Sequence, residues 1–209
     1  IQMESRSDKR LVYLASCVAG LRNLTFKQKN KMVPVVQYTI REGVKFRTKD
    51  TDDVCLILGN MDNLREAARH VDTINRVQLG QLIRTLQHSW VDALVVACAS
   101  EIVEVTEHQP LVRQEGDIFI DLDIDGDVRF VIERYLALRR KVSEFGLNTI
   151  WEMQPALNGS QLQNEVGVPK GPLVGRVMAE QINWQLANPH GSREELVQYL
   201  REALAAMQN

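Results

Sequence analysis

The residues whose types and spacing best suit a chemical task lie in one turn, which reads VGVPKGPLVGR from Val166 to Arg176. Glycine lets a backbone approach a partner closely, and Gly171 directly precedes Pro172, a residue favoured in the first turn of a helix. The free amides at such a helix start attract phosphate, and Lys170 and Arg176 add positive charge beside them. The pattern therefore predicts a site that holds a nucleic acid by its backbone without reading its sequence. The same spacing also fits a turn that merely joins two packed helices.

Two helices are expected to hold this turn in the order typical of a helix-hairpin-helix. A short helix begins within residues 158–162, and a longer one covers residues 172–187, where the run Asn-Pro-His-Gly stops it. Ser192 and Glu195 have the spacing of a capping box, which predicts a last helix over residues 193–207. The turn is thus expected to be positioned by elements close to it in sequence.

Two further groups of basic residues are candidates for contacts with an anion. The groups are Arg139, Arg140 and Lys141, and Arg41, Lys45 and Arg47. The first group lies in the later turns of a long helix expected over residues 127–145, and it would supply a second contact to a phosphate backbone. The second group belongs to a segment that can equally face the solvent.

The acidic run from Asp121 to Asp127 has the first ligand positions of a calcium-binding EF-hand loop. The glutamate that closes such a loop is missing, because Ile132 stands at its position and Glu133 comes one residue late. An acidic loop leading into a helix explains the run better. Asp121 and Asp123 also have the spacing of a two-metal carboxylate pair, but the Gly-Ser phosphate loop that polymerases of that type carry upstream is absent.

No catalytic residue and no metal ligand is predicted in this sequence. The four histidines show no metal-ligand spacing, and there is no C-x-x-C, G-x-S-x-G or P-loop pattern. The residue patterns therefore point to binding of a partner rather than to a catalytic site.

Charge is strongly segregated along the chain, although the formal net charge is only −2. Residues 1–50 contain eleven Lys or Arg and four acids, whereas residues 101–133 contain ten acids and two basic residues. This asymmetry indicates an anionic partner for the basic part, and nucleic acid is the commonest such partner. Runs of charge also occur simply as solvated helix faces, so that alternative stays open.

The composition is that of a globular protein, with 44% hydrophobic and 25% charged residues. No run of ~20 apolar residues is present, so no membrane-spanning helix is expected. The three cysteines are far apart, which suits buried, reduced thiols rather than disulfides. The sequence starts at Ile1 without the pattern of a secretory signal, and we expect an intracellular protein and a piece of a longer chain.

Apolar residues recur at intervals of three and four over most of the sequence, as is typical of helices with one buried face. Residues 102–124 interrupt this pattern with Pro110 and Gly116, and they are expected to form an extended acidic insertion or a short strand. The predicted fold is all-α. A multi-helix body over residues 1–154 is followed by a small helical tail over residues 155–209, which contains the helix-hairpin-helix-like turn.

Several stretches make the chain resemble a known family. Besides the turn itself they are NGSQL at residues 158–162, WQLANPHGSREE at residues 184–195 and PVVQYTIREGVKF at residues 34–46. Together they resemble the C-terminal body and tail of eukaryotic tRNA nucleotidyltransferases, the CCA-adding enzymes, with the fungal members nearest. The resemblance covers most of the chain, and residues 101–127 match least.

The resemblance implies how such a chain takes part in a reaction. Enzymes of this family add C, C and A to the 3′ end of tRNA from CTP and ATP. Their N-terminal head binds Mg²⁺ through an Asp-x-Asp pair, and a neck selects the nucleotide. Neither part is found in this sequence, so the chain is expected to clamp tRNA as body and tail. Family members serve the mitochondrion, the cytosol and the nucleus, which leaves the compartment open.

Two other interpretations fit the same residues. One is a non-enzymatic helix-hairpin-helix module that binds nucleic acid and prefers duplex DNA to tRNA. The other is a protein-interaction scaffold, in which the basic and acidic segments pair with each other or with a second copy of the chain.

Overall fold

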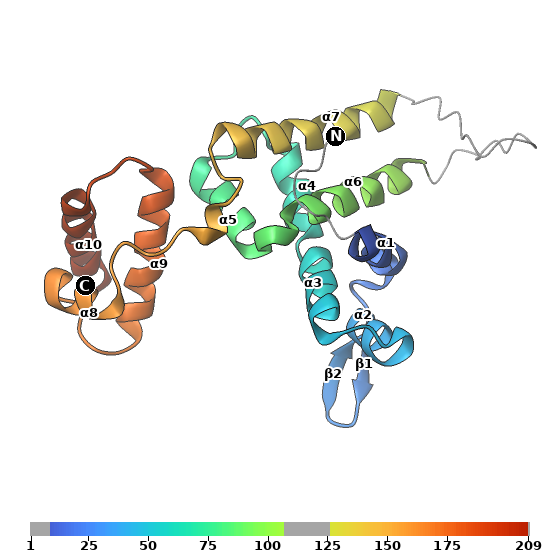
Figure 1. Ribbon diagram of the computed structural model, residues 1–209, viewed down its shortest axis with the longest axis horizontal. Coiled ribbons are helices and arrows are strands. Elements are labelled where there is room, and N and C mark those ends of the chain that lie inside the picture. The colour runs from blue at the N-terminus through green and yellow to red at the C-terminus, as the bar shows by residue number, and fades with distance from the viewer. Residues whose placement is uncertain (1–8, 107–125, 209) are drawn as a thin grey trace, which may run out of the picture.

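The computed structural model describes residues 9–106 and 126–208, and this part of the chain is essentially all-α, as predicted (Figure 1). The helices up to residue 106 are α1 (Lys9–Val18), α2 (Val35–Tyr38), α3 (Thr48–Gly59), α4 (Met61–Arg69), α5 (Arg76–Leu86) and α6 (Trp90–Thr106). The later helices are α7 (Gly126–Glu144), α8 (Gly159–Gln161), α9 (Pro172–Ala187) and α10 (Arg193–Gln208). Short 3-10 or π-helical segments are η1 (Ala19–Leu21), η2 (Thr39–Val44), η3 (Gln87–Ser89), η4 (Ile150–Glu152) and η5 (Leu162–Val166). Two strands, β1 (Thr25–Gln28) and β2 (Lys31–Pro34), form a hairpin.

The core of the body forms where α4, α6 and α7 pack against one another and α1 and α3 cover α6. Ala15 of α1 and Leu79 of α5 are fully buried, as their positions in the apolar stripes predict, and Leu138 of α7 is fully buried as well. Complete burial of a leucine side chain contributes roughly 1.5–3 kcal/mol to stability. This packing makes the body a firm support for the later turns of α7.

A separate hydrophobic cluster holds the tail. In it α9 and α10 pack against each other and against η5, and they bury Leu162, Val177 and Leu200 completely. The bounds of α9 are those predicted. At the start of α10 the Glu195 N–H donates to Ser192 Oγ at 3.2 Å, and the Ser192 N–H donates to the Glu195 carboxylate at 2.8 Å. The capping box predicted from the sequence is therefore confirmed.

Contacts between α5 and α9 join the tail to the body. Leu186 of α9 belongs to the hydrophobic cluster of the body, where its Cδ2 lies only 2.6 Å from a Cβ built at Gly80. The missing side chain at Gly80 thus lets α9 come close to α5. Arg76 Nε donates to the Leu186 carbonyl at 2.6 Å, and the Gln81 side chain donates to that of Asn183 at 2.6 Å. The two parts of the chain consequently share a specific polar and apolar contact.

The hairpin of β1 and β2 departs from the helical pattern of the sequence. Its strands pair antiparallel from Thr25 with Pro34 to Gln28 with Lys31, and the turn between them holds Lys29 at φ 54°. Residues other than glycine rarely adopt this conformation. The turn also lacks the Asn-Gly or Asp-Gly pair that announces a hairpin in a sequence. The local signal for this hairpin is therefore weak.

Two expectations are wrong in part. Because α6 continues to Thr106, residues 102–106 are helical and do not belong to an extended insertion. The rest of that prediction, over residues 107–124, lies outside the described residues. Cys17 is exposed and the other two cysteines are half-buried, so none of the three thiols is fully enclosed as expected.

Candidate nucleic-acid interface

Local hydrogen bonds and two glycines shape the turn before α9. Asn158 and Gln161 cap α8 reciprocally, because the backbone amide of each donates to the side chain of the other at 2.9 Å. Gly167 directly follows η5, and its N–H donates to the carbonyl of Leu162, the first residue of η5. Gly167 then lies at φ 88° and Gly171 at φ 133°, which are conformations that residues with a side chain avoid. Both glycines are therefore required by the path of the backbone.

Apolar side chains anchor the inner side of the turn. Val166 and Val168 are 6% and 2% exposed, and they pack in the tail cluster together with Val177 of α9. Lys170 and Gly171 follow on the exposed side. A Cβ built at Gly171 meets no atom within 4 Å, so the space above the turn is open. The turn is thus firm on one side and accessible on the other.

The first turn of α9 is open as well. Gly171 is the N-cap residue without a side-chain hydrogen bond, and Pro172 occupies the first helical turn. Lys170 and Arg176 are exposed, and neither forms an ion pair within the described residues. A Cβ built at Gly175 also meets no atom within 4 Å. A helix start with two exposed cations beside it is a combination that attracts a phosphate group.

Two glutamines of α9, which the sequence patterns do not single out, hold the segment leading into the tail. Gln181 is fully buried; its side chain accepts from the Leu157 N–H at 2.8 Å and donates to the Leu157 carbonyl at 2.9 Å. One turn later, Gln185 accepts from the Ala156 N–H at 3.2 Å and donates to the Gln154 carbonyl at 3.3 Å. The bonds of Gln181 satisfy the backbone groups of the buried Leu157, which are costly to leave unpaired. The only feature of the sequence that could have predicted these contacts is the position of a glutamine, Gln181, within an apolar stripe.

Two arginines of α10 are occupied by contacts inside the tail. Arg193 pairs with the Glu165 carboxylate at 2.7 Å, and Arg201 donates twice to the Glu165 carbonyl, at 2.6 and 3.1 Å. Tyr199 donates to the Glu180 carboxylate of α9, and this hydrogen bond, together with burial, raises the pKa of Tyr199 to about 12. These side chains hold α10 against α9 and η5. Lys170, by contrast, has no ion pair among the described residues.

The group Arg139, Arg140 and Lys141 lies on α7 and is only partly free. Arg140 is exposed, whereas Arg139 and Lys141 are half-buried. Lys141 Nζ lies 5.2 Å from the ring centroid of Phe145, which is a cation–π contact. α7 packs on α4 and α6 in the body. The structure therefore does not bring the basic group of α7 into the hydrophobic cluster of the tail, to which the turn before α9 belongs.

The group Arg41, Lys45 and Arg47 lies on η2 and just before α3. All three residues are exposed. Arg41 Nε lies 3.7 Å from the carboxylate of its neighbour Glu42, and Lys45 follows η2 with a φ of 61°. These side chains face the solvent, as the alternative interpretation of this segment expects.

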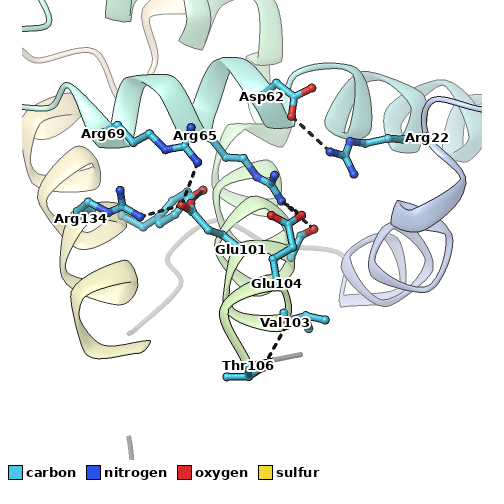
Figure 2. A network of polar contacts seen from close by, with 11 residues as sticks. Arg22, Asp62, Arg65, Arg69, Glu101, Val103, Glu104, Thr106 and Arg134 are labelled. Atoms are coloured by element: carbon cyan, nitrogen blue, oxygen red, sulfur yellow. Dashed lines mark hydrogen bonds and ion pairs between the residues drawn. The ribbon is translucent and has the colours of Figure 1, made fainter. Parts of the chain in front are cut away.

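A buried carboxylate of α6 accepts hydrogen bonds from two arginines (Figure 2). The sequence alone does not show whether such arginines are paired inside the fold or free to bind a ligand. Glu101 is 5% exposed, and one of its oxygens accepts from Arg134 at 2.8 Å and from Arg69 at 3.4 Å. The Tyr135 hydroxyl donates to the other oxygen at 2.8 Å. Burial alone would raise the pKa of Glu101, but the hydrogen bond from Tyr135 and the charge of Arg134 outweigh it, so this pKa is lowered. Burial and the bond to Glu101 raise the pKa of Tyr135.

Arg65 of α4 extends this network along α6. Its Nη2 donates to the Glu104 carboxylate at 2.6 Å and to Ser100 Oγ at 3.0 Å, and the residue is 8% exposed. Burial, reinforced by Glu101, raises the pKa of Cys98 to about 11, so its thiol is protonated at neutral pH. The network therefore joins α4, α6 and α7 and offers neither a nucleophile nor a free charge.

Within residues 9–106 and 126–208, no three His, Cys, Asp or Glu side chains gather as they would to hold a metal ion. The acidic run that begins at Asp121 lies outside these ranges up to residue 125. Among the described residues, no helix combines the length and the apolar character needed to cross a membrane.

Known proteins were compared with the chain. A mitochondrial CCA tRNA nucleotidyltransferase of Candida glabrata is 22% identical to it over 212 residues, which cover 98% of this chain and 37% of the relative. The tRNA nucleotidyltransferase cca1 of Schizosaccharomyces pombe is 21% identical over 206 residues, which cover 95% of this chain and 37% of the relative. The chain is similar to fungal tRNA nucleotidyltransferases along nearly its whole length.

This similarity confirms the family resemblance found in the sequence. A second tRNA nucleotidyltransferase of Schizosaccharomyces pombe, cca2, is 29% identical over 136 residues, which cover 65% of this chain and 24% of the relative. The chain spans between 24% and 37% of the length of these relatives. No protein-family model and no solved structure matches it.

Proposed function

We propose that this chain is the tRNA-holding body and tail at the C-terminal side of a tRNA nucleotidyltransferase. The observation that carries the proposal is the open turn before α9, where Lys170, Gly171 and Arg176 are exposed and the two cations have no ion pair in the described part of the chain. A phosphate backbone is the partner that such a helix start suits. The fungal relatives, named as tRNA nucleotidyltransferases, support RNA as the polymer that carries it.

The proposed contact does not read base sequence. Backbone amides around Gly171 and the charges of Lys170 and Arg176 bind phosphate oxygens, which every tRNA presents alike. This suits a protein whose substrates share a shape and differ in sequence. The specific contact between α5 and α9 keeps the turn in a fixed relation to the body.

A second proposed contact lies on α7. There Arg139, Arg140 and Lys141 meet another stretch of the same RNA, with the exposed Arg140 as the principal charge. Two separate contacts would clamp the RNA and set its orientation, whereas one contact would only tether it.

We propose that nucleotidyl transfer itself takes place outside this chain. We propose that Mg²⁺, CTP and ATP bind in the remainder of such an enzyme, since the chain spans at most 37% of the length of the relatives above. The 209-residue chain alone is then inactive. Incorporation of CMP or AMP into tRNA by the purified chain would contradict this part of the proposal.

Direct binding of tRNA tests the proposed function. A fluorescently labelled tRNA transcript without its CCA end is titrated with the purified chain, and an unlabelled duplex DNA of equal length serves as competitor. We expect saturable binding that weakens with salt, with poor competition by the DNA. Preferential binding of the DNA would favour the non-enzymatic helix-hairpin-helix module. Dimerisation without RNA binding at low salt would favour the protein-interaction scaffold.

A further inference from the structure

The hairpin of β1 and β2 carries a dense cationic surface that the interface proposed above does not include. Figure 1 shows the hairpin projecting from the body, well apart from α9 and α10. Lys27, Lys29 and Lys31 lie within five residues at its tip, and all three are exposed. Over residues 25–49 the chain has seven Lys or Arg and a single acid, Glu42. The hairpin therefore holds three of the seven basic residues of this stretch.

The lysines of the tip are not neutralised by the fold. Within the described residues, Lys27, Lys29 and Lys31 form no ion pair and no side-chain hydrogen bond. Arg65 and Arg134 of the body, by contrast, are both paired with glutamates. Like charges this close in sequence repel one another, and no ion pair among the described residues offsets the repulsion. An anionic partner would offset it.

Strand register places positive charge on both faces of the hairpin. Residues paired across an antiparallel ladder share a face, and neighbours along a strand alternate. Lys27, which pairs with Met32, thus lies on the face opposite to Phe26, whereas Lys31 lies on the face of Phe26. Lys29 occupies the turn between them. The tip therefore carries positive charge on both faces and in the turn. This arrangement suits a bend or groove of a nucleic acid, where phosphates approach from more than one side.

Contacts at its base hold the hairpin in place. The rings of Phe26 and Tyr38 meet edge to face with centroids 5.0 Å apart, and the Val35 N–H donates to the Leu24 carbonyl at 2.9 Å. An isolated two-stranded hairpin is only marginally stable, so this support to α2 is needed to present the tip. Met32, 63% exposed, adds an apolar surface beside the lysines that can cover sugar or base.

We propose that the tip of this hairpin is a second RNA-binding element, which contacts the phosphate backbone through Lys27, Lys29 and Lys31. The choice of RNA rests on the proposed function, while the cationic surface is observed independently of it. Because the hairpin and the turn before α9 lie in different parts of the molecule, they bind different stretches of one RNA. Loss of the hairpin charge therefore weakens binding of a long RNA and leaves the contact at the tail intact.

The test is the variant Lys27→Gln/Lys29→Gln/Lys31→Gln in the full 209-residue chain. Affinity for a full-length tRNA transcript is measured at several salt concentrations around ~0.1 M. We expect affinity to fall about tenfold or more, and the slope of log K against log salt to become shallower by about 2, at ~0.7 for each lost contact in the single-strand limit. Thermal unfolding should be unchanged, because exposed lysines contribute little to stability.

Two control variants separate charge from structure. Lys27→Arg/Lys29→Arg/Lys31→Arg keeps the charge and should bind as the parent chain does. Lys9→Gln/Arg129→Gln removes two exposed cations elsewhere and should leave the slope unchanged.

Each outcome decides between the hairpin and the tail. An unchanged slope in the Lys→Gln variant, with binding by the parent chain intact, overturns the hairpin proposal and leaves the proposed function standing. Absence of tRNA binding by the parent chain overturns both. Equal losses in the Lys→Gln and Lys→Arg variants show a structural role and overturn the hairpin proposal. If the parent chain dimerises and the Lys→Gln variant does not, while RNA binding is the same in both, the hairpin proposal is overturned. The hairpin would then bind a second copy of the chain.

Discussion

Basic residues serve opposite purposes in the core of the body and at the turn of the tail. Arg65 and Arg134 are largely buried and paired with carboxylates, whereas Lys170 and Arg176 are exposed without an ion pair in the described residues. Removing one partner of a buried pair leaves an uncompensated charge, while exposed cations contribute little to stability and stay available to a ligand. Cations that hold the fold together are buried and paired, whereas cations that are available to a ligand are exposed and unpaired. A count of charges in the sequence does not reveal this difference. Substitutions in the first set should therefore change folding, and substitutions in the second should change RNA binding.

The largest expected effect is on stability, from Glu101→Gln in the buried network. Arg134, Arg69 and Tyr135 lose their charged partner, which should lower the free energy of unfolding by about 3 kcal/mol. Urea unfolding followed by circular dichroism measures this change. Glu165→Gln is the matched control, because the side chains of Glu165 and its partner Arg193 are 36% and 44% exposed, and a loss of about 1 kcal/mol or less is expected there. Equal losses in the two variants would contradict the distinction between buried and exposed partners.

A polar group inside the tail should give the next largest effect. Gln181→Met keeps the size of the side chain but leaves the N–H and carbonyl of Leu157 without partners, at a cost of about 2 kcal/mol. Gln185→Met serves as the control, because its bonds are longer and its side chain is half-buried. Urea unfolding should rank Gln181→Met clearly below Gln185→Met in stability. The reverse ranking would show that Gln181 does not hold the entry to the tail.

Two glycines of the turn should respond in opposite directions. Gly171→Ala forces a side chain into φ 133° and should cost roughly 1–3 kcal/mol, with weaker RNA binding because the turn shifts. Gly175→Ala lies within α9, where its Cβ meets no atom within 4 Å, and should stabilise the protein by roughly 0.5–1 kcal/mol. Thermal unfolding of both variants checks the signs. Similar changes in both would mean that the turn tolerates a side chain at Gly171.

The smallest expected effect is on acid stability. Burial disfavours the charge of Glu101, but Tyr135 and Arg134 outweigh it and lower its pKa in the folded state. This stabilisation is complete above the ordinary value of 4.5 and is lost as the pH falls through the lower folded-state pKa. Unfolding curves below about pH 4.5 should therefore depend less on pH in Glu101→Gln than in the parent chain. Parallel pH profiles would assign the acid sensitivity to other groups.

Local signals made the bounds of α9 and the cap of α10 predictable from the sequence. Gly171, Pro172 and the spacing of Ser192 and Glu195 each act within a few residues, and the structure reproduces the start of α9 and the capping box. The body network has no such signal, since Glu101 meets Arg134 and Tyr135 more than thirty residues further along the chain. These partners become visible only when α6 and α7 pack together.

The basic residues show the same limit. The sequence placed Lys170 and Arg176 beside a helix start correctly, but it could not tell that Arg193 and Arg201 are occupied by Glu165. It also missed the hairpin around Lys29, whose turn lacks the usual residues. Whether Lys170, Arg176 and the group on α7 contact RNA stays a prediction.

The most direct test is the salt dependence of tRNA binding by Lys170→Ala/Arg176→Ala, compared with Lys9→Ala/Arg129→Ala as a matched pair of exposed cations. Each lost phosphate contact should reduce the slope of log K against log salt by ~0.9 in the duplex limit, so about 1.8 is expected for the tail variant and none for the control. The free energy of unfolding should change by less than about 0.5 kcal/mol in both. A slope that stays unchanged in the tail variant would contradict the claim that the open turn before α9 holds the RNA.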